Sequence, residues 1–107
     1  MEKFKFIKDL NPSNKDLNDD EIKMGIRYFL SSSLKDYYNN PKVFIVKIDI
    51  RISYSKEGVT NYKLITMSNK VNEKDMDQLL TVFYLRCKQK EIKLASLKKM
   101  FLYVWIA

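Results

Sequence analysis

The stretch "VFIVKIDIRISYS", residues 43–55, decides the fold because apolar residues occupy every second position in it. Successive side chains of a β-strand point to opposite faces of the sheet, so this alternation predicts a strand with one buried and one solvated face. The expected buried face consists of Phe44, Val46, Ile48, Ile50, Ile52 and Tyr54. The expected solvated face consists of Lys47, Asp49, Arg51 and Ser53.

A second strand is expected to return from this one through a hairpin. A three-residue loop over residues 56–58, with Gly58 in the left-handed conformation, pairs Ser55 with Val59. This register puts Tyr62 and Leu64 on the buried face and Lys63, Ile65 and Met67 on the solvated face. A two-residue loop would exchange the two faces and bury Lys63, so the three-residue loop is the predicted one.

Two helices are expected, one before and one after this hairpin. Asn18 and Glu21 form a capping box for the first helix, which ends at residues 39–41, and Asn72 is expected to cap the second. Apolar residues recur at helical spacing in both helices and predict one buried face for each. These faces consist of Ile22, Ile26, Phe29, Leu30, Ser33 and Tyr37 in the first helix, and of Met76, Leu79, Leu80, Phe83 and Cys87 in the second.

Two further strands are expected near the ends of the chain. In residues 3–8, Phe4 and Phe6 face one way and Lys3 and Lys5 the other. The stretch "MFLYVWIA", residues 100–107, is apolar on both faces. Because branched aliphatic side chains pack well beneath helices, we assign Leu102, Val104 and Ile106 to the core and Phe101, Tyr103 and Trp105 to the outer face. Residues 91–99 are compatible with a short strand or with a helical turn.

The elements follow the order strand, helix, strand, strand, helix, strand. This order predicts a single α+β domain over residues 1–107, with a four-stranded, mainly antiparallel sheet and two helices on one face. The arrangement is ferredoxin-like or a related two-layer sandwich. The alternative is an α+β meander in which the first strand is peripheral or absent. In either case one face of the sheet is left open.

The residue types that catalysis needs are scarce in this chain. There is no histidine, so the usual general base near neutral pH is missing, and two glycines are too few for a phosphate-binding loop. Asp49 is expected to form an ion pair with a flanking cation, and Cys87 is expected to be a buried structural thiol. We therefore predict a protein that is not an enzyme and that uses neither a metal nor a cofactor.

The basic charge is unevenly distributed along the chain. The formal net charge is +7, and residues 1–41 carry as many acidic as basic side chains, so the excess lies in residues 42–107. Basic side chains beside aromatic ones are typical of surfaces that bind single-stranded nucleic acid. The candidate binding residues are Lys47, Arg51, Lys63, Tyr103 and Trp105 on the sheet, and Arg86, Lys88, Lys90, Lys93, Lys98 and Lys99 in the Lys-rich segment. AT-rich coding DNA is a second interpretation of the lysine excess, and it implies no ligand.

Two functions are compatible with this pattern. The first is a small basic module that binds nucleic acid or a nucleoprotein. The alternative is a protein-binding inhibitor or accessory factor of viral or mobile-element type, such as an anti-defence protein, as a monomer or as a homodimer through the sheet face. A cytoplasmic location is expected, because no apolar run approaches the ~20 residues of a membrane-spanning helix and the first residues lack the apolar core of a signal peptide.

Overall fold

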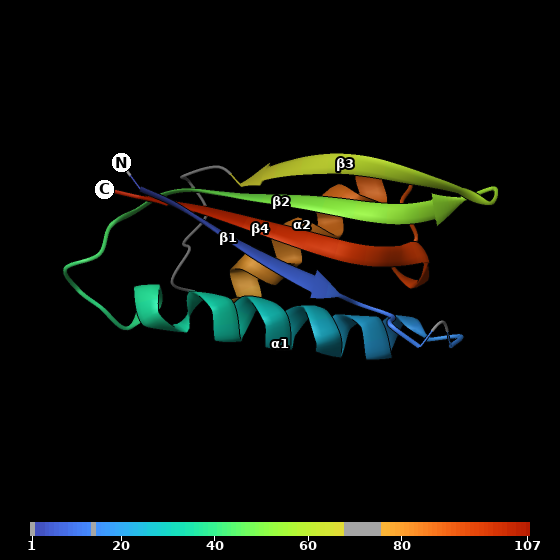
Figure 1. Cartoon of the computed structure of the whole chain (residues 1–107), viewed down its shortest axis with the longest axis horizontal. Coiled ribbons are helices and arrows are strands. Elements are labelled where there is room, and N and C mark those ends of the chain that lie inside the picture. The colour runs from blue at the N-terminus through green and yellow to red at the C-terminus, as the bar shows by residue number, and fades with distance from the viewer. Residues whose placement is uncertain (1, 14, 68–75) are drawn as a thin grey trace.

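Four strands and two long helices follow one another along the chain in the predicted order. The computed structural model describes residues 2–13, 15–67 and 76–107 (Figure 1). The elements are β1 (Glu2–Asp9), α1 (Asp19–Tyr38), β2 (Ile45–Lys56), β3 (Val59–Met67), α2 (Met76–Gln89), the 3-10 turn η1 (Leu94–Ser96) and β4 (Leu97–Ile106). Residues 91–99 were compatible with a short strand or with a helical turn, and they contain both: the 3-10 turn Leu94–Ser96 and the start of β4 at Leu97.

The sheet has the strand order β1-β4-β2-β3, and every neighbouring pair is antiparallel. β4 lies between β1 and β2, and β2 lies between β4 and β3, so each strand-helix-strand connection encloses one other strand. This is the split β-α-β arrangement of a two-layer α+β sandwich, as predicted. The second and fourth strands are central here, whereas the ferredoxin-like order has its first and third strands at the centre, so the fold is the related sandwich.

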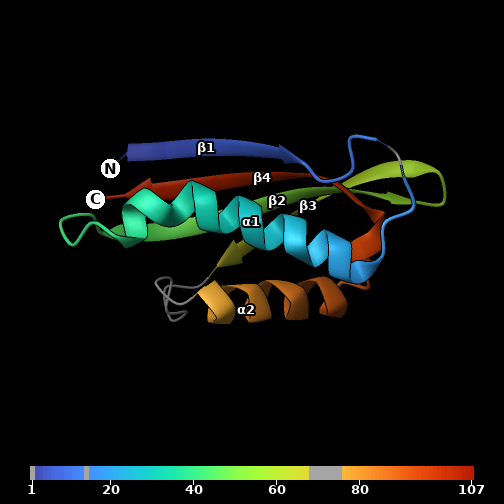
Figure 2. The ribbon, with the colours of Figure 1, turned by 90° about the horizontal axis from the view of Figure 1, so that it is seen from below.

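Both helices lie on the same side of the sheet (Figure 2). The sheet residues beneath them are fully buried, including Ile48, Ile50 and Ile52 on β2 and Leu102 and Val104 on β4. The helices contribute the predicted stripes to this core, with one addition on α1. Leu34, one turn after Leu30, is fully buried, whereas the predicted Ser33 is half-buried, because the stripe continues along the i, i+4 positions.

The start of α1 carries the predicted capping box. The backbone N–H of Glu21 donates to Asn18 Oδ1 at 2.9 Å, and the backbone N–H of Asn18 donates to Glu21 Oε1 at 3.3 Å. These bonds satisfy two donors that the first turn of the helix leaves unpaired within the helix itself. Asn72, the predicted cap of the second helix, lies outside the described residues.

The hairpin between β2 and β3 differs from the prediction by one residue. Lys56 pairs with Val59, so the loop consists of two residues, Glu57 and Gly58, with φ angles of 53° and 74°. Two consecutive residues with positive φ are the requirement of a type I′ turn, whose twist matches the twist of the flanking strands. The three-residue loop was therefore the wrong choice.

The one-residue change in register exchanges the two faces of β3. Ile65 pairs with Ile50 and Met67 pairs with Ile48, and both are buried in the core instead of facing solvent. Tyr62 and Leu64, which were predicted to be buried, are exposed. Lys63 lies on the helix side of the sheet but is itself exposed, so the buried ammonium that argued against this register does not arise.

The start of β2 also departs from strict alternation. A register shift between Ile45 and Lys47 changes which residues face the core. Ile45 is buried, whereas Phe44, predicted to be buried, is 67% exposed and Val46 is half-buried. An extra residue in one strand turns the side chains before it to the opposite face, which is the usual effect of a β-bulge.

Candidate binding site on the open face of the sheet

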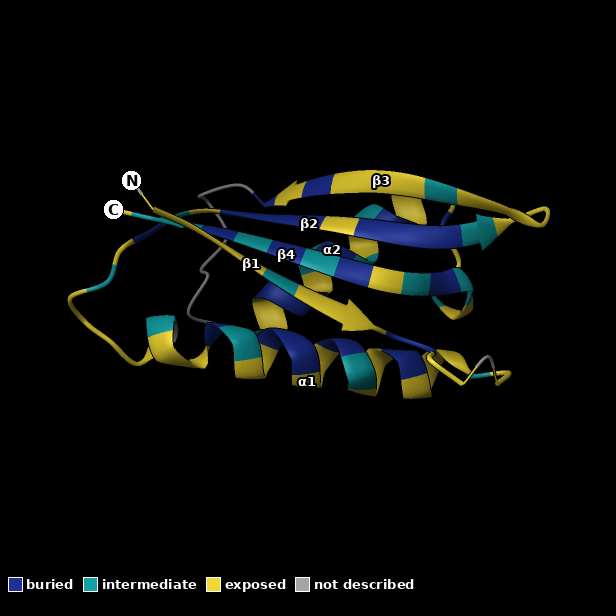
Figure 3. Cartoon of the chain, viewed as in Figure 1, coloured by how far each residue is buried: buried dark blue, intermediate teal, exposed yellow. Residues whose placement is uncertain are grey.

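The open face is the side of the sheet that points away from the two helices. Its central part is formed by Phe101, Tyr103 and Trp105 on β4, which alternate with the buried Met100, Leu102 and Val104. The assignment of the last strand is therefore confirmed: its branched aliphatic residues face the helices and its aromatic residues face outward. Figure 3 shows that β1 is mostly exposed, whereas the two central strands are mostly buried or half-buried.

The strand registers arrange the open face in rows that cross the sheet. The rows, from β1 to β3, are Ile7, Phe101, Arg51 and Leu64; then Lys5, Tyr103, Asp49 and Thr66; then Lys3, Trp105 and Lys47. Each aromatic residue of β4 therefore lies between a residue of β1 and a residue of β2. Side chains that face each other across two strands lie about 4.5–5.5 Å apart at Cβ, so these neighbours are in contact range.

We refer to Phe101, Tyr103 and Trp105 as the aromatic ladder. The ring centroids of Tyr103 and Trp105 lie 6.2 Å apart, and all three residues are half-buried although nothing from the helix layer covers them. Their partial burial comes from neighbours on the adjacent strands, whose long side chains lie over the rings. The ladder is thus a row of aromatic rings on the side of the molecule that faces solvent.

Cations from both adjacent strands lie over these rings. On the β1 side, Lys3 Nζ lies 4.9 Å from the Tyr103 centroid and 5.2 Å from that of Trp105, and Lys5 Nζ lies 5.6 Å from Phe101 and 5.7 Å from Tyr103. These distances are within the range of cation–π attraction. Both predicted lysines of the first strand therefore face outward, and both contact the aromatic ladder.

On the β2 side the same arrangement recurs with a lysine and an arginine. Lys47 Nζ lies 4.9 Å from the centroid of Trp105. The guanidinium carbon of Arg51 lies 5.5 Å from the centroid of Phe101 and 4.8 Å from that of Tyr62 on β3. We call Lys3, Lys5, Lys47 and Arg51 the flanking cations. Positive charge thus lines both sides of the aromatic ladder.

Asp49 is the acidic residue at the centre of this face. Its Oδ2 lies 3.2 Å from Lys47 Nζ, which confirms the predicted ion pair with a flanking cation. Asp49 was predicted on a solvated face, yet it is only 4% exposed, because the bulky side chains around it cover it. Its Oδ1 is buried and has no hydrogen-bond partner. Ser53, which follows on the same face, is buried as well and accepts a hydrogen bond from the backbone N–H of Lys99 at 3.1 Å.

The structure brings together part of the predicted binding set. Four of the predicted residues lie together on the open face: Lys47, Arg51, Tyr103 and Trp105. Lys99 lies at one end of this face, where it pairs with Ser53. Lys63 does not join them, because the observed register turns it to the helix side of the sheet. The remaining residues lie elsewhere: Arg86, Lys88 and Lys90 at the end of α2, Lys93 in the loop after it, and Lys98 at the irregularity that begins β4. Tyr62 also lies on the open face, although it was predicted to be buried. A two-residue type I′ loop in the sequence-based register would have placed it correctly.

The helix layer holds a second, less basic region. A pocket of about 380 Å³ between the start of α1, the end of α2 and η1 is lined by Lys23, Lys88 and Lys93 together with Asp19 and Tyr84. Cys87 also borders this pocket, and burial raises the pKa of its thiol to about 12. A thiol with such a pKa stays protonated and unreactive near neutral pH, in keeping with the structural role predicted for it.

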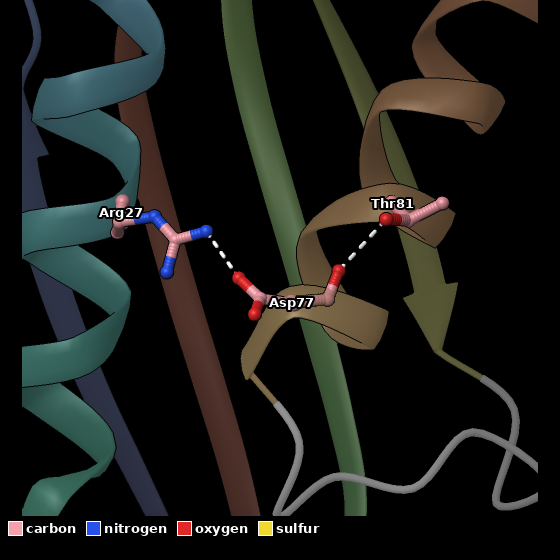
Figure 4. Close-up of polar contacts among 3 residues, drawn as sticks. All are labelled: Arg27, Asp77 and Thr81. Atoms are coloured by element: carbon pink, nitrogen blue, oxygen red, sulfur yellow. Dashed lines mark hydrogen bonds and ion pairs between the residues drawn. The ribbon is translucent and has the colours of Figure 1, made fainter.

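One ion pair joins the two helices at the surface. Arg27 on α1 and Asp77 on α2 point toward each other, and Thr81 Oγ1 donates to the backbone oxygen of Asp77 at 2.8 Å (Figure 4). Hydrogen bonding to Asp77 raises the pKa of Arg27, which keeps it charged. Both partners are largely exposed, and exposed pairs of this kind contribute little to stability. The pair links the two helices at the surface and does not form a binding site.

None of the helices in the described residues is both long and apolar enough to cross a membrane. No protein-family model matches the chain, and no curated protein sequence matches it.

Proposed function

We propose that this protein is a small, non-enzymatic module that binds single-stranded nucleic acid, alone or within a nucleoprotein, through the open face of its sheet. The observation that carries the proposal is the aromatic ladder with cations on both sides. Single-strand binders combine aromatic side chains on which bases stack with cations that follow the phosphates. Both elements are present on the same face, and they come from three adjacent strands.

The flanking cations lie over the rings in the free protein, so a base has to replace them. Each ring of the ladder has two cations over it, and a cation–π contact at an exposed site contributes about 0.5–1 kcal/mol, so a base displaces contacts of about 1–2 kcal/mol. Stacking of a base on an aromatic side chain contributes about 1–3 kcal/mol. A lysine that leaves a ring also gains a phosphate as its new partner. The exchange therefore favours the bound state, with the base on the ring and the cation beside it on the backbone.

A single strand fits this surface better than a duplex does. The ring faces are useful only to bases that are unstacked, and bases within a duplex are stacked on one another. Reading a duplex through its major groove uses a helix or a two-stranded ribbon, and a broad four-stranded sheet face is neither. Binding to duplex is expected to be weak and to depend on charge alone.

An acidic protein surface is the second candidate partner. Ile7, Tyr62 and Leu64 are exposed at the margins of the open face, and exposed apolar residues around a charged centre favour a protein contact. The protein would then act as an inhibitor or accessory factor of viral or mobile-element type. A homodimer through the open face is disfavoured, because it would bring two copies of the same positively charged face together. That face carries Lys3, Lys5, Lys47, Arg51 and Lys99.

The proposal also includes a cytoplasmic location and the absence of a cofactor. The free, buried thiol of Cys87 supports this location, because unpaired cysteines are typical of reducing compartments. The stacking and charge contacts described above need no bound metal or organic group.

The test is a fluorescence anisotropy titration with a labelled oligo-dT strand of about 12 nucleotides and with a hairpin duplex, each at several salt concentrations. We expect single-strand binding that weakens with salt, and each cation that contacts a phosphate contributes about 0.7 to the slope of log K against log salt. Lys47→Ala should lower the affinity and reduce this slope by about 0.7.

Lys63→Ala is the matched control, because it removes the same charge from the helix side of the same sheet. It should leave affinity and slope nearly unchanged. Equal losses in the two variants would mean that general positive charge, and not the open face, binds the strand. No binding at any salt concentration would overturn the proposal and favour the protein partner.

A further inference from the structure

Asp49 lies at the centre of the open face, between Tyr103 on β4 and Thr66 on β3. Its side chain is 5% exposed, and its Oδ2 is paired with Lys47. Within the described part of the chain, Asp49 Oδ1 is the buried side-chain oxygen that has no hydrogen-bond partner. A buried acceptor without a donor destabilises the free protein, so a ligand that brings a donor to this oxygen would remove that cost.

We propose that Asp49 is the base-reading residue of the open face and that its carboxylate accepts a hydrogen bond from the exocyclic amino group of cytosine. This inference rests on the proposed function and deepens it by naming the preferred pyrimidine. An ionised carboxylate only accepts hydrogen bonds, so the edge of the base beside it must present a donor. Cytosine presents an amino group at position 4, where thymine and uracil present a carbonyl oxygen that a carboxylate repels. The N3–H donor of thymine and uracil lies between two such carbonyl oxygens, so it is a poorer partner for a carboxylate than the amino group of cytosine.

The aromatic ladder brings a base to the right place for this contact. Tyr103 is the direct cross-strand neighbour of Asp49, whereas Phe101 and Trp105 are its diagonal neighbours. Direct neighbours have Cβ atoms about 4.5–5.5 Å apart. A pyrimidine stacked on Tyr103 therefore has one edge within reach of the carboxylate.

The free protein covers Oδ1, so the side chains around it have to move before a base can reach it. Lys47 is the side chain that can move away, because it is 45% exposed. Its ammonium group contacts both Asp49 and the Trp105 ring. When a phosphate of the bound strand pairs with the ammonium group of Lys47, the carboxylate of Asp49 loses its partner and needs a new hydrogen-bond donor. Arg51, the next cation along the strand, lies over the rings of Tyr62 and Phe101 instead. Binding of the backbone and reading of the base are thus coupled through Lys47.

The experiment compares oligo-dC with oligo-dT, both of about 12 nucleotides, near neutral pH and at one salt concentration. Anisotropy gives the affinity of the wild-type protein and of Asp49→Asn, and circular dichroism shows that the variant is folded. The wild-type protein should bind oligo-dC at least about fivefold more tightly than oligo-dT. In Asp49→Asn the ratio should fall to about one, because an amide both donates and accepts and so tolerates either base.

Each other outcome overturns a defined part of the account. Equal affinities in the wild-type protein, or tighter binding of oligo-dT, overturn the inference and leave the proposed function standing. No binding of either strand overturns the proposed function and the inference with it. A preference for oligo-dC that persists in Asp49→Asn shows that another residue reads the base. If the variant does not fold, the wild-type protein is tested with pyrimidin-2-one, which lacks the amino group, in place of cytosine, and an unchanged affinity then overturns the inference.

Discussion

Single residues of the open face are held by contacts that the proposed nucleic-acid strand would replace. Trp105 is the clearest example, because Lys3 and Lys47 place ammonium groups over its ring from the two adjacent strands. The indole is half-buried by these flexible side chains and makes no part of the core beneath the helices. It is therefore expected to matter for binding more than for folding.

Replacement of Trp105 by alanine should weaken binding of a single strand by about 1–3 kcal/mol, because it removes one stacking platform. The protein should remain folded, since Val104 and Leu102 still fill the core. Anisotropy and circular dichroism measure the two effects. Tyr28→Ala is the control, because Tyr28 is an exposed aromatic residue on the helix layer. Loss of the fold in the Trp105 variant, or equal losses of affinity in both variants, would contradict the assignment.

Cys87 gives a residue-scale prediction about pH. Burial raises the pKa of its thiol from 9.0 to about 12 in the folded protein, and Lys90 lowers it by a smaller amount. The folded state therefore retains a proton that the unfolded state loses, so the contribution of this group to the free energy of unfolding is complete below pH 9.0 and declines as the pH rises toward 12. Chemical denaturation across this range measures the decline, and Cys87→Ala should show a shallower one. Equal slopes would mean that the thiol is not shielded as described.

The sequence predicts residues well where a local rule fixes them. The capping box of Asn18 and Glu21 depends on residues three positions apart and was predicted correctly. The burial of Asp49 was not, because it depends on the rings of a strand some 50 positions later in the chain. The unpartnered Oδ1 likewise has no sequence signal, since nothing near Asp49 in the chain distinguishes it from a solvated ion-pair residue.

At the scale of elements, the hairpin shows that the alternation of residues on β3 can be recognised correctly while its buried and exposed faces are exchanged. The segment Lys56-Glu57-Gly58 accommodates both a two-residue and a three-residue loop, and the two choices differ by one residue in register. The prediction avoided a buried lysine, but Lys63 is exposed in the observed register. Alternation on β3 was visible in the sequence, whereas the edge position that leaves Lys63 exposed was not.

The loop residue Glu57 carries an element-scale prediction. It has a φ of 53°, a conformation that costs a non-glycine residue about 1–2 kcal/mol and that asparagine tolerates better. Glu57→Asn should therefore raise the free energy of unfolding by up to about 1 kcal/mol, and Gly58→Ala should lower it because φ is 74° there. Urea denaturation of both variants measures the changes. A stabilising Gly58→Ala would contradict the two-residue loop.

At the scale of the whole molecule, the two faces of the sheet differ in what they contact. The helices and the inner face of the sheet form the core, whereas the outer face carries the aromatic ladder and the flanking cations (Figure 2). The order of elements could be predicted from periodicity, and the outward aromatic face of β4 could be predicted from the good packing of branched aliphatic side chains beneath helices. The strand order could not, because it is set by which strands pair across the sheet, and that pairing alone places Lys3 and Lys47 on opposite sides of Trp105.

The most direct test of the central claim, that a single strand binds on the open face, uses the fluorescence of Trp105. It is the one tryptophan in the sequence, so the emission of the protein reports on this face without a label. Titration with oligo-dC should quench the emission along the same curve that anisotropy gives for binding, because a base stacks on or beside the indole. Salt-dependent binding with unchanged Trp105 emission would place the strand elsewhere on the molecule and contradict the account.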